Sequence, residues 1–206
     1  MSEILSRRAI VPVMVALLLA ACSSKAPPPV AADVAPLWQH HLAQLETVTT
    51  WSFQGRVAVR QGKEAWNVKL DWSQSRDRYD LLLTAPWGQG AVRLYGETGR
   101  AVLEAPDRAP LVAEDPQTLL ARQVGWQVPV TQLRYWMLGR PKPDQGAVIE
   151  WDGRGLVRHM NQAGWSIDYR RYGDVRGVSL PRKIELKNEA LRLRLVIDKW
   201  RLNEDE

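Results

Sequence analysis

The polar and apolar positions along the chain change their spacing near residue 50. Between Leu37 and Val48 the apolar residues recur every three to four positions, which is the spacing of an amphipathic helix. From Trp51 onward apolar and polar residues alternate, as they do in strands with one buried and one solvated face. Gly, Pro and Asp residues interrupt the alternation and predict strands at 51–60, 66–72, 79–83, 91–96, 100–105 and 110–113.

The alternation stops in the middle of the chain and then returns. Asp115-Pro116 has the residue types of a helix N-cap and first helical position, and Gly125 is a typical helix stop. A second short helix is predicted from Val130 to Leu138, with Gly139 after its end. Further alternating runs predict strands at 147–151, 156–160, 165–172, 177–186 and 191–200.

This order of elements predicts a mainly β fold with an α lid. About eleven antiparallel strands that share one apolar face tend to curl toward a barrel, and short helices can cover that face. We therefore expect an open, incomplete antiparallel β-barrel that encloses a hydrophobic cavity. The candidate lining residues are apolar side chains in the inward phase of the strands or on the second helix: Trp51, Phe53, Val57, Trp66, Val68, Leu70, Leu81, Leu83, Leu133, Trp136, Met137, Trp151, Trp165, Ile167, Leu193 and Leu195.

The aromatic composition bears on what this apolar face does. The chain contains 10 Trp and 5 Tyr but only 1 Phe. A packed barrel core explains any single inward-facing Trp, and that alternative stays open for each of them. Large rings distributed over many strands also line apolar cavities, so the set as a whole favours a binding cavity.

The remaining composition excludes several classes of protein. Of the 206 residues, 45% are hydrophobic and 25% are charged, which is ordinary for one folded domain and excludes a mainly disordered or polytopic membrane protein. The net charge of +5 is spread among residues of both signs. This favours a solvated surface over nucleic-acid binding, with weak attraction to anionic lipid as a second option. A single Cys excludes an internal disulfide framework and a Cys-cluster zinc site.

The first 22 residues have the features of a lipoprotein signal. Arg7-Arg8 precede an apolar run from Ile10 to Ala21, which is shorter than a transmembrane helix and has the length of a signal-peptide core. The run ends in Leu19-Ala20-Ala21-Cys22, which resembles a bacterial lipobox with an acylated cysteine; a plain secretory signal with an incidental Cys is the alternative. We expect a signal peptide at 1–21, a lipidated Cys22 with a Pro/Ala-rich tether at 22–36, and a single domain at 37–206.

No set of residues predicts a catalytic or cofactor site. His40 and His41 are adjacent and point to different faces of the first helix, and His159 lies on a strand with no nearby carboxylate. The chain has no Gly-x-Ser-x-Gly motif and no Gly-x-x-x-x-Gly-Lys loop. We therefore expect no metal, no cofactor and no enzymatic activity.

The connection after the third predicted strand carries a tryptophan. Pro86 ends the strand, and Gly88 and Gly90 follow, so Trp87 falls in a connection, where residues usually face solvent. Trp rings suit membrane interfaces and hydrophobic partner surfaces, which makes Pro86, Trp87 and Gly88 a candidate membrane-delivery loop. The alternative is that Trp87 folds back over the end of the sheet.

Several motifs, taken in order, resemble the LolB family, the outer-membrane lipoprotein receptors of the lipoprotein-localisation (Lol) pathway. Besides the lipobox and tether, these motifs are Arg78-Tyr79-x-Leu81-Leu82-Leu83-Thr84-x-Pro86-x-Gly88, Gly125-x-x-x-Pro129, Leu133-Arg134-x-Trp136-x-Leu138-Gly139-x-Pro141 and Asp198-x-Trp200. The resemblance implies an open LolA/LolB-like barrel with a helical lid. It also implies a protruding loop whose exposed leucine is required for membrane delivery, and Trp87 stands at that position here.

The resemblance also implies a function. Such a receptor is anchored in the outer membrane and faces the periplasm, and Ser23 in place of Asp after the cysteine agrees with that location. It accepts lipoproteins from the soluble carrier LolA, holds their acyl chains in its cavity, and inserts them into the inner leaflet of the outer membrane. Expected partners are a LolA-like carrier loaded with lipoprotein, the acyl chains of the cargo and outer-membrane phospholipid, with no nucleic acid; a monomer is expected.

A function of a different class stays open. The chain could be a lipid-anchored module that holds a small apolar ligand or stabilises the envelope, without transferring protein cargo. Exchange of a lipoprotein from a soluble carrier would separate the two classes.

Overall fold

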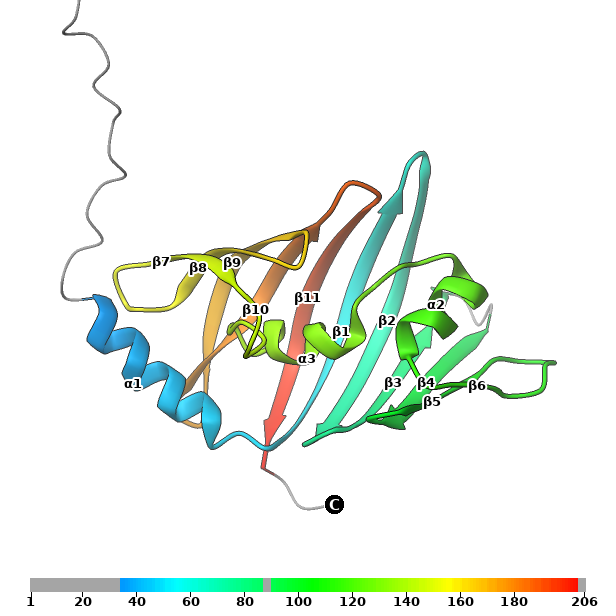
Figure 1. The fold of residues 1–206 in the computed structure, drawn as a ribbon, viewed down its shortest axis with the longest axis horizontal. Helices are drawn as coiled ribbons and strands as arrows, with labels where there is room; N and C mark the ends of the chain where they lie inside the picture. Colours follow the sequence, from blue (N-terminus) through cyan, green and yellow to red (C-terminus); the bar gives the residue numbers. More distant parts are fainter. Residues whose placement is uncertain (1–33, 87–89, 204–206) are drawn as a thin grey trace, which may run out of the picture. The chain divides into compact units, whose positions relative to one another are not determined.

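The computed structural model describes residues 34–86 and 90–203, which form one antiparallel sheet and three helices (Figure 1). The helices are α1 (Val34–Glu46), α2 (Pro116–Val124) and α3 (Val130–Trp136). The strands are β1 (Thr50–Gln61), β2 (Glu64–Ser75), β3 (Arg78–Thr84), β4 (Ala91–Glu97), β5 (Arg100–Glu104), β6 (Leu111–Ala113), β7 (Ala147–Trp151), β8 (Val157–Gln162), β9 (Trp165–Val175), β10 (Val178–Lys187) and β11 (Leu191–Leu202).

The predicted fold class is confirmed, and the sheet is not closed. Its strand order is β6-β5-β4-β3-β2-β1-β11-β10-β9-β8-β7, so the first and last strands pair in the middle while β6 and β7 form the two edges. The segment that carries α2 and α3 joins these two edges. Figure 1 shows α3 in front of the middle of the sheet and α2 in front of the β3–β5 side.

The observed elements differ from the predicted ones mainly at their ends. Helix α1 begins at Val34, three residues before the expected Leu37, and ends at Glu46 rather than Val48. Pro36 is compatible with this earlier start because the first turn of a helix needs no hydrogen bond from its N–H groups. At α2 the expected cap is present: Asp115 accepts hydrogen bonds from the N–H groups of Gln117 and Thr118, and Gly125 takes the left-handed conformation after the last turn.

Alternation along β1 places its large apolar side chains on one face. Trp51 and Phe53 are buried and form an aromatic cluster with Trp72 of β2 and Trp200 of β11, with ring centroids 5.1 to 5.9 Å apart. Gly55 continues the buried face at a register shift between β1 and β11. A Cβ atom there would lie 2.5 Å from the carbonyl oxygen of Val196, so the two central strands can approach this closely only at a glycine.

Helix α3 is fastened to the sheet by hydrogen bonds around two buried side chains. The indole Nε1 of Trp136 donates to Oε1 of Gln162 on β8 at 2.7 Å, and the hydroxyl of Tyr169 on β9 donates to the Trp136 carbonyl at 2.9 Å. Gln162 also accepts from the N–H of Lys142 and donates to the carbonyls of Lys142 and Gln145. One amide side chain therefore connects α3, the segment after it and the sheet.

Helix α1 packs against β10 and the β7–β8 connection through a narrow contact. Its buried residues are Trp38, His41 and Leu45, and the Trp38 ring lies 6.3 Å from that of Trp151. Gly155 has a φ of +76°, and a Cβ atom there would lie 2.6 Å from Cβ of Leu37. The close approach of α1 thus depends on a residue without a side chain.

The burial of His41 predicts a pH-dependent stability. Burial lowers the pKa of His41, with a smaller contribution in the same direction from His40, while Gln44 and Asp152 oppose it. Since the unfolded chain keeps the ordinary value near 6.5, it binds more protons than the folded chain just below that pH. The free energy of unfolding should therefore fall as the pH drops below about 6.5, by at most about 1.4 kcal/mol per pH unit from this residue.

We expect His41→Gln to flatten this dependence in urea unfolding measured between pH 5 and 8. His40→Gln, at an exposed position on the same helix, is the matched control and should keep most of the wild-type slope, because His40 makes only a smaller contribution to the pKa of His41. Equal slopes for wild type and His41→Gln would show that His41 does not cause the effect.

The position of Gln162 predicts a large effect of its removal. Gln162→Leu would leave the Trp136 indole N–H and the Lys142 N–H without acceptors in a buried place, and each such group costs about 1–3 kcal/mol. We expect a loss of about 3 kcal/mol or more in urea unfolding, with faster amide exchange in α3 than in β1 and β2. Gln54→Leu, an exposed site on β1, is the control; unchanged protection of α3 in Gln162→Leu would contradict the role of this side chain.

Candidate functional site

The sixteen predicted lining residues all belong to one continuous apolar cluster. The structure divides them by exposure. Twelve are buried: Trp51, Phe53, Val57, Leu70, Leu81, Leu133, Trp136, Met137, Trp165, Ile167, Leu193 and Leu195. The other four are half-buried at the margin of the cluster: Trp66, Val68, Leu83 and Trp151.

The centre of the cluster is filled with side chains in this conformation. Phe53, Trp136 and Ile167 expose 1% of their surface or less. A side chain that lined a water-sized cavity would expose surface to it, so these three residues pack directly on their neighbours. The open part of the apolar face therefore lies at the margin, where the half-buried residues are.

An apolar groove of about 450 Å³ opens between the ends of β2–β5 and the end of α2. Trp66 and Val68 of β2, Leu83 of β3, Val92 of β4 and Trp126 line it. The rings of Trp66 and Trp126 meet edge to face, with centroids 5.7 Å apart. Its volume lies within the roughly 300–1,000 Å³ of ligand pockets, and its walls have the apolar character that such pockets share.

The groove also uses residues that strand alternation does not point to. Val124 is at the end of α2, Trp126 follows the helix stop Gly125, and Arg108 and Gln123 form a polar rim with a hydrogen bond of 3.2 Å. The one signal in the sequence is the position of Trp126 directly after Gly125. Its contact with Trp66, sixty residues earlier in the chain, depends on how α2 packs on β5 and β6.

The candidate loop connects to this groove at both of its ends. Ala85 and Gly90 line the groove and are joined by a hydrogen bond of 3.0 Å from the Ala85 N–H to the Gly90 carbonyl. Pro86 is exposed. Trp87, Gly88 and Cys22 lie outside the described residues.

A second opening lies toward the opposite edge of the sheet from the groove, at the edge strand β7. It has a volume of about 780 Å³ and includes Ala147, Val148 and Trp165 among its lining residues. Val148 is 68% exposed, while the ring of Trp165 packs 6.3 Å from that of Trp136. Trp165 thus connects this opening to the buried core beneath α3.

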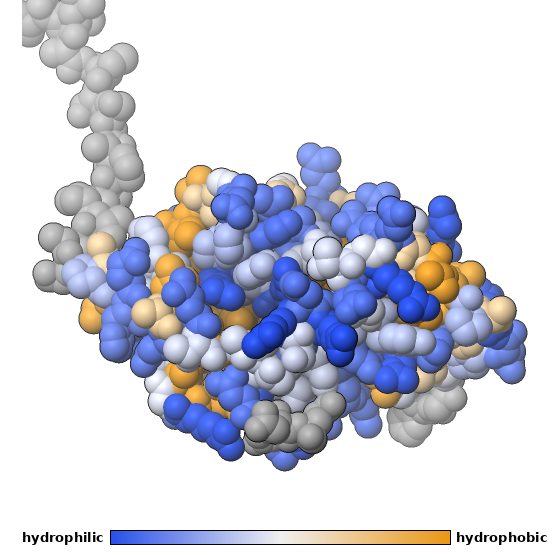
Figure 2. Space-filling model, turned by 60° about the horizontal axis from the view of Figure 1, so that its bottom comes forward, coloured by the Kyte–Doolittle hydropathy of each residue, from blue (hydrophilic) through white to orange (hydrophobic). Residues whose placement is uncertain are grey.

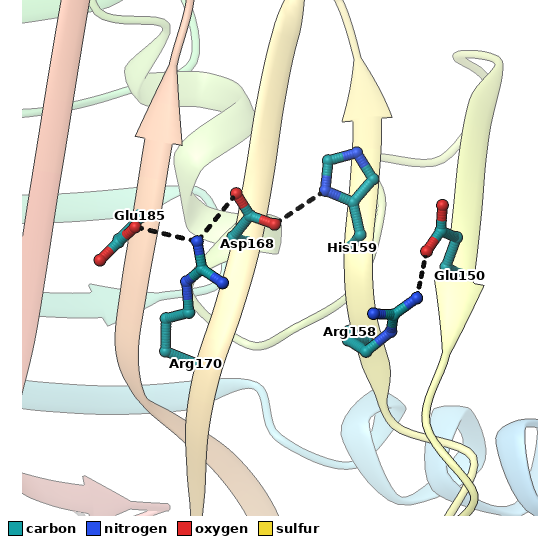
Figure 3. A network of polar contacts seen from close by, with 6 residues as sticks. All are labelled: Glu150, Arg158, His159, Asp168, Arg170 and Glu185. Atoms are coloured by element: carbon teal, nitrogen blue, oxygen red, sulfur yellow. Dashed lines mark hydrogen bonds and ion pairs between the residues drawn. The ribbon is translucent and has the colours of Figure 1, made fainter.

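The opposite face of the β7–β11 side carries paired charges (Figure 3). His159 lies 3.0 Å from Asp168, which corrects the expectation that it has no nearby carboxylate; the register of β8 and β9 places the two residues opposite each other. Arg170 contacts both Asp168 and Glu185, and Arg158 pairs with Glu150. Arg158 and Glu150 are exposed while His159, Asp168 and Glu185 are half-buried, and the pairs lie on a surface where such ion pairs contribute little stability.

Two other features bear on the class of protein. In residues 34–86 and 90–203, three or more His, Cys, Asp or Glu side chains nowhere gather into a group that could bind a metal ion. None of the helices in the described part of the chain combines the length and the apolar character needed to cross a membrane.

Comparison with known proteins agrees with this architecture. The model of the family described as outer membrane lipoprotein LolB matches residues 49–200. The outer-membrane lipoprotein LolB of Nitrosococcus oceani is 40% identical over 187 residues, covering 90% of this chain and 93% of the relative. That of Pseudomonas putida is 36% identical over 163 residues, covering 79% and 80%.

A solved structure supports the fold. A LolA superfamily protein from Nitrosomonas europaea superposes with a TM-score of 0.58 at 8% identity, over 82% of this chain and 94% of that one. At this identity the likeness concerns the fold alone, whereas the sequence relatives and the matched family model establish membership. The chain therefore belongs to the LolB family of outer-membrane lipoproteins.

Proposed function

We propose that this protein is an outer-membrane receptor that accepts lipoproteins from a LolA-like periplasmic carrier and inserts them into the inner leaflet of the outer membrane. The observation that carries the proposal is the apolar groove, which Ala85 and Gly90 at the two ends of the candidate loop help to line. It is continuous with an apolar core that helices cover, in a chain of the LolB family. Both features suit a ligand made of long hydrocarbon chains.

The energetics allow such a transfer without a nucleotide. Removing an acyl chain from water gains about 0.8 kcal/mol per CH₂ group. When the chain moves from one apolar cavity to another, this large gain is present on both sides and nearly cancels. A small difference in affinity between carrier, receptor and membrane then sets the direction.

The filled interior supports the proposal that the cargo first contacts the groove. Trp66, Val68 and Leu83 offer apolar surface that is already open. The core beneath α3 is filled with side chains, and hydrogen bonds hold α3 on the sheet above it. We propose that an acyl chain enters along these three side chains. Further entry toward Phe53 and Trp136 then requires α2 or α3 to move.

The anchor and the loop would hold the open groove near the bilayer. We propose that Cys22 carries the lipid anchor and that residues 22–36 tether the domain. A single acyl chain binds a membrane only reversibly, and two or more anchor it stably. Trp87, between the two groove-lining positions Ala85 and Gly90, would contact the interface where released chains enter the membrane.

The loop assignment predicts a defect in release. We expect Trp87→Glu to fold and to take cargo from a loaded LolA-type carrier as wild type does, because the groove walls are unchanged. Incorporation of a radiolabelled lipoprotein into liposomes should be slower by about tenfold or more, since insertion of a carboxylate into the membrane interface is unfavourable. Val112→Glu, on the edge strand β6 with 59% exposure, is the control; incorporation by Trp87→Glu at the wild-type rate would refute the role of the loop.

The groove assignment predicts a defect in uptake instead. Val68→Asp places a charge on the half-buried groove wall, where an acyl chain would have to desolvate it. We expect uptake from the carrier to fall by about tenfold or more, with the far-ultraviolet circular dichroism spectrum retained. Val112→Asp is the matched control at an exposed site. Normal uptake by folded Val68→Asp would exclude the groove as the entry point, and no uptake by wild type would favour a ligand-binding module without cargo transfer.

A further inference from the structure

A small pocket rich in arginine lies at the other end of β2 from the apolar groove. Its volume is about 200 Å³, and its walls come from the end of α1, the start of β1, the turn between β2 and β3, and the end of α3. We call it the arginine pocket; its charged lining residues are Glu46, Arg76, Asp77, Arg134 and Arg140. Figure 2, which brings the lower end of Figure 1 forward, shows strongly hydrophilic residues gathered about the middle of this face.

Arg134 is held in a fixed position by several contacts. Its Nη1 donates to the carboxylate of Asp77 at 2.6 Å and to the Arg76 carbonyl at 3.3 Å. Its Nη2 donates to the hydroxyl of Tyr135 at 3.0 Å, and its guanidinium carbon lies 4.9 Å from the centre of that ring. The charge of Arg134 is therefore already compensated by Asp77.

Arg140 differs from Arg134 because no carboxylate forms an ion pair or hydrogen bond with it in the described part of the chain. Its guanidinium carbon lies 5.2 Å from the centre of the Tyr135 ring, and its Nε is buried without a hydrogen-bond partner. Among the described residues it forms no side-chain hydrogen bond or ion pair, although it is half-buried. Burial lowers the pKa of Arg140, and the nearby Tyr135 and Glu46 oppose that shift only in part.

A half-buried guanidinium without an anion is costly, and an oxyanion would relieve this cost. Arginine offers five N–H donors in a planar fork that matches phosphate or carboxylate oxygens. Three arginines and two carboxylates are among the lining residues of this pocket, and one of the carboxylates, Asp77, already binds Arg134. The pocket therefore has donors and positive charge available for one anionic group.

The apolar neighbours of the pocket narrow the class of ligand. Trp51, Val48 and Leu138 line it beside the arginines. Trp51 stacks on Phe53 with centroids 5.9 Å apart, so the pocket adjoins the aromatic cluster beneath α3. The Trp51, Val48 and Leu138 side chains are buried, so the pocket itself suits the anionic head of an amphiphile whose hydrocarbon chains lie outside it.

We propose that the arginine pocket binds the phosphate group of a phospholipid, with Arg140 donating to its oxygens and the acyl chains extending outward from the pocket. This ligand is distinct from the cargo proposed above, and the proposal does not depend on transfer from a carrier. It would give the protein a binding site for the lipid of its own membrane at the end of the sheet away from the loop.

The test is calorimetric titration of the full chain in non-ionic detergent with three probes. Dihexanoyl phosphatidylglycerol carries both the phosphate and the chains, inorganic phosphate carries the anion alone, and dihexanoylglycerol carries the chains alone. We expect the phospholipid to bind and Arg140→Gln to weaken it by about tenfold or more, as the loss of a charged hydrogen bond requires. Glu46→Gln should bind more tightly than wild type, because it removes a competing charge from an exposed position.

Arg122→Gln, at an exposed position on α2 outside the pocket, is the matched control and should bind as wild type does. Phospholipid affinity that is unchanged in both Arg140→Gln and Glu46→Gln would overturn the proposal, as would equal binding of dihexanoylglycerol. Inorganic phosphate that binds as tightly as the phospholipid would overturn the membrane source and leave a site for free phosphate. If a thermal melt shows that Arg140→Gln is unfolded, the affinity of Glu46→Gln for the phospholipid tests the proposal by itself: tighter binding supports it, and unchanged binding overturns it.

Discussion

The structure depends on one topological constraint: the chain must cross its own apolar face. Because β1 and β11 pair in the middle of the sheet, the two edge strands β6 and β7 lie at opposite sides, yet they are consecutive along the chain. The segment between them therefore passes over the face that the strands leave apolar. Helices α2 and α3 are that segment, and covering the face is what stabilises an open sheet that would otherwise expose its core to water.

The two helices of the crossing segment are attached to the sheet by different kinds of contact. Helix α3 is tied to β8 and β9 by buried hydrogen bonds through Gln162 and Tyr169, and Trp136 fills the centre of the core. Helix α2 makes its contacts by packing against β5, β6 and α3. The apolar groove lies on the α2 side, where the cover is lighter, and the stems of the 86–89 loop border it. The proposed entry of hydrocarbon chains and the proposed contact with the membrane would thus lie on the same side of the sheet.

Charge and apolar surface are separated along β2. The groove meets the strand at Trp66 and Val68, and the arginine pocket meets it at Gln74. Between them lies the aromatic cluster that includes Trp72. An amphiphile bound at the pocket and a chain bound in the groove would therefore approach the same core from two ends. The paired charges on the opposite face, such as Arg170 with Glu185, keep that face soluble and take no part in this arrangement.

The sequence by itself determined the elements and their faces, because alternation and capping are local. The period of two places Phe53 and Val57 inside, and Asp115, Pro116 and Gly125 fix the limits of α2. The motifs taken in order, from the lipobox to Asp198-x-Trp200, also pointed to the family. The structure agrees with these local predictions because each depends only on residues a few positions apart in the chain.

Only the tertiary structure decided how these elements meet. The pairing of His159 with Asp168 follows from strand register, and the contact of Trp66 with Trp126 follows from the packing of α2. Whether an inward side chain fills a core or borders an opening depends on the volume its neighbours leave, so Trp136 is fully buried while Trp66 lines a groove. For the same reason the sequence does not show the state of Arg140: its buried Nε lacks a hydrogen-bond partner only because of how α1, α3 and the β2–β3 turn pack around it.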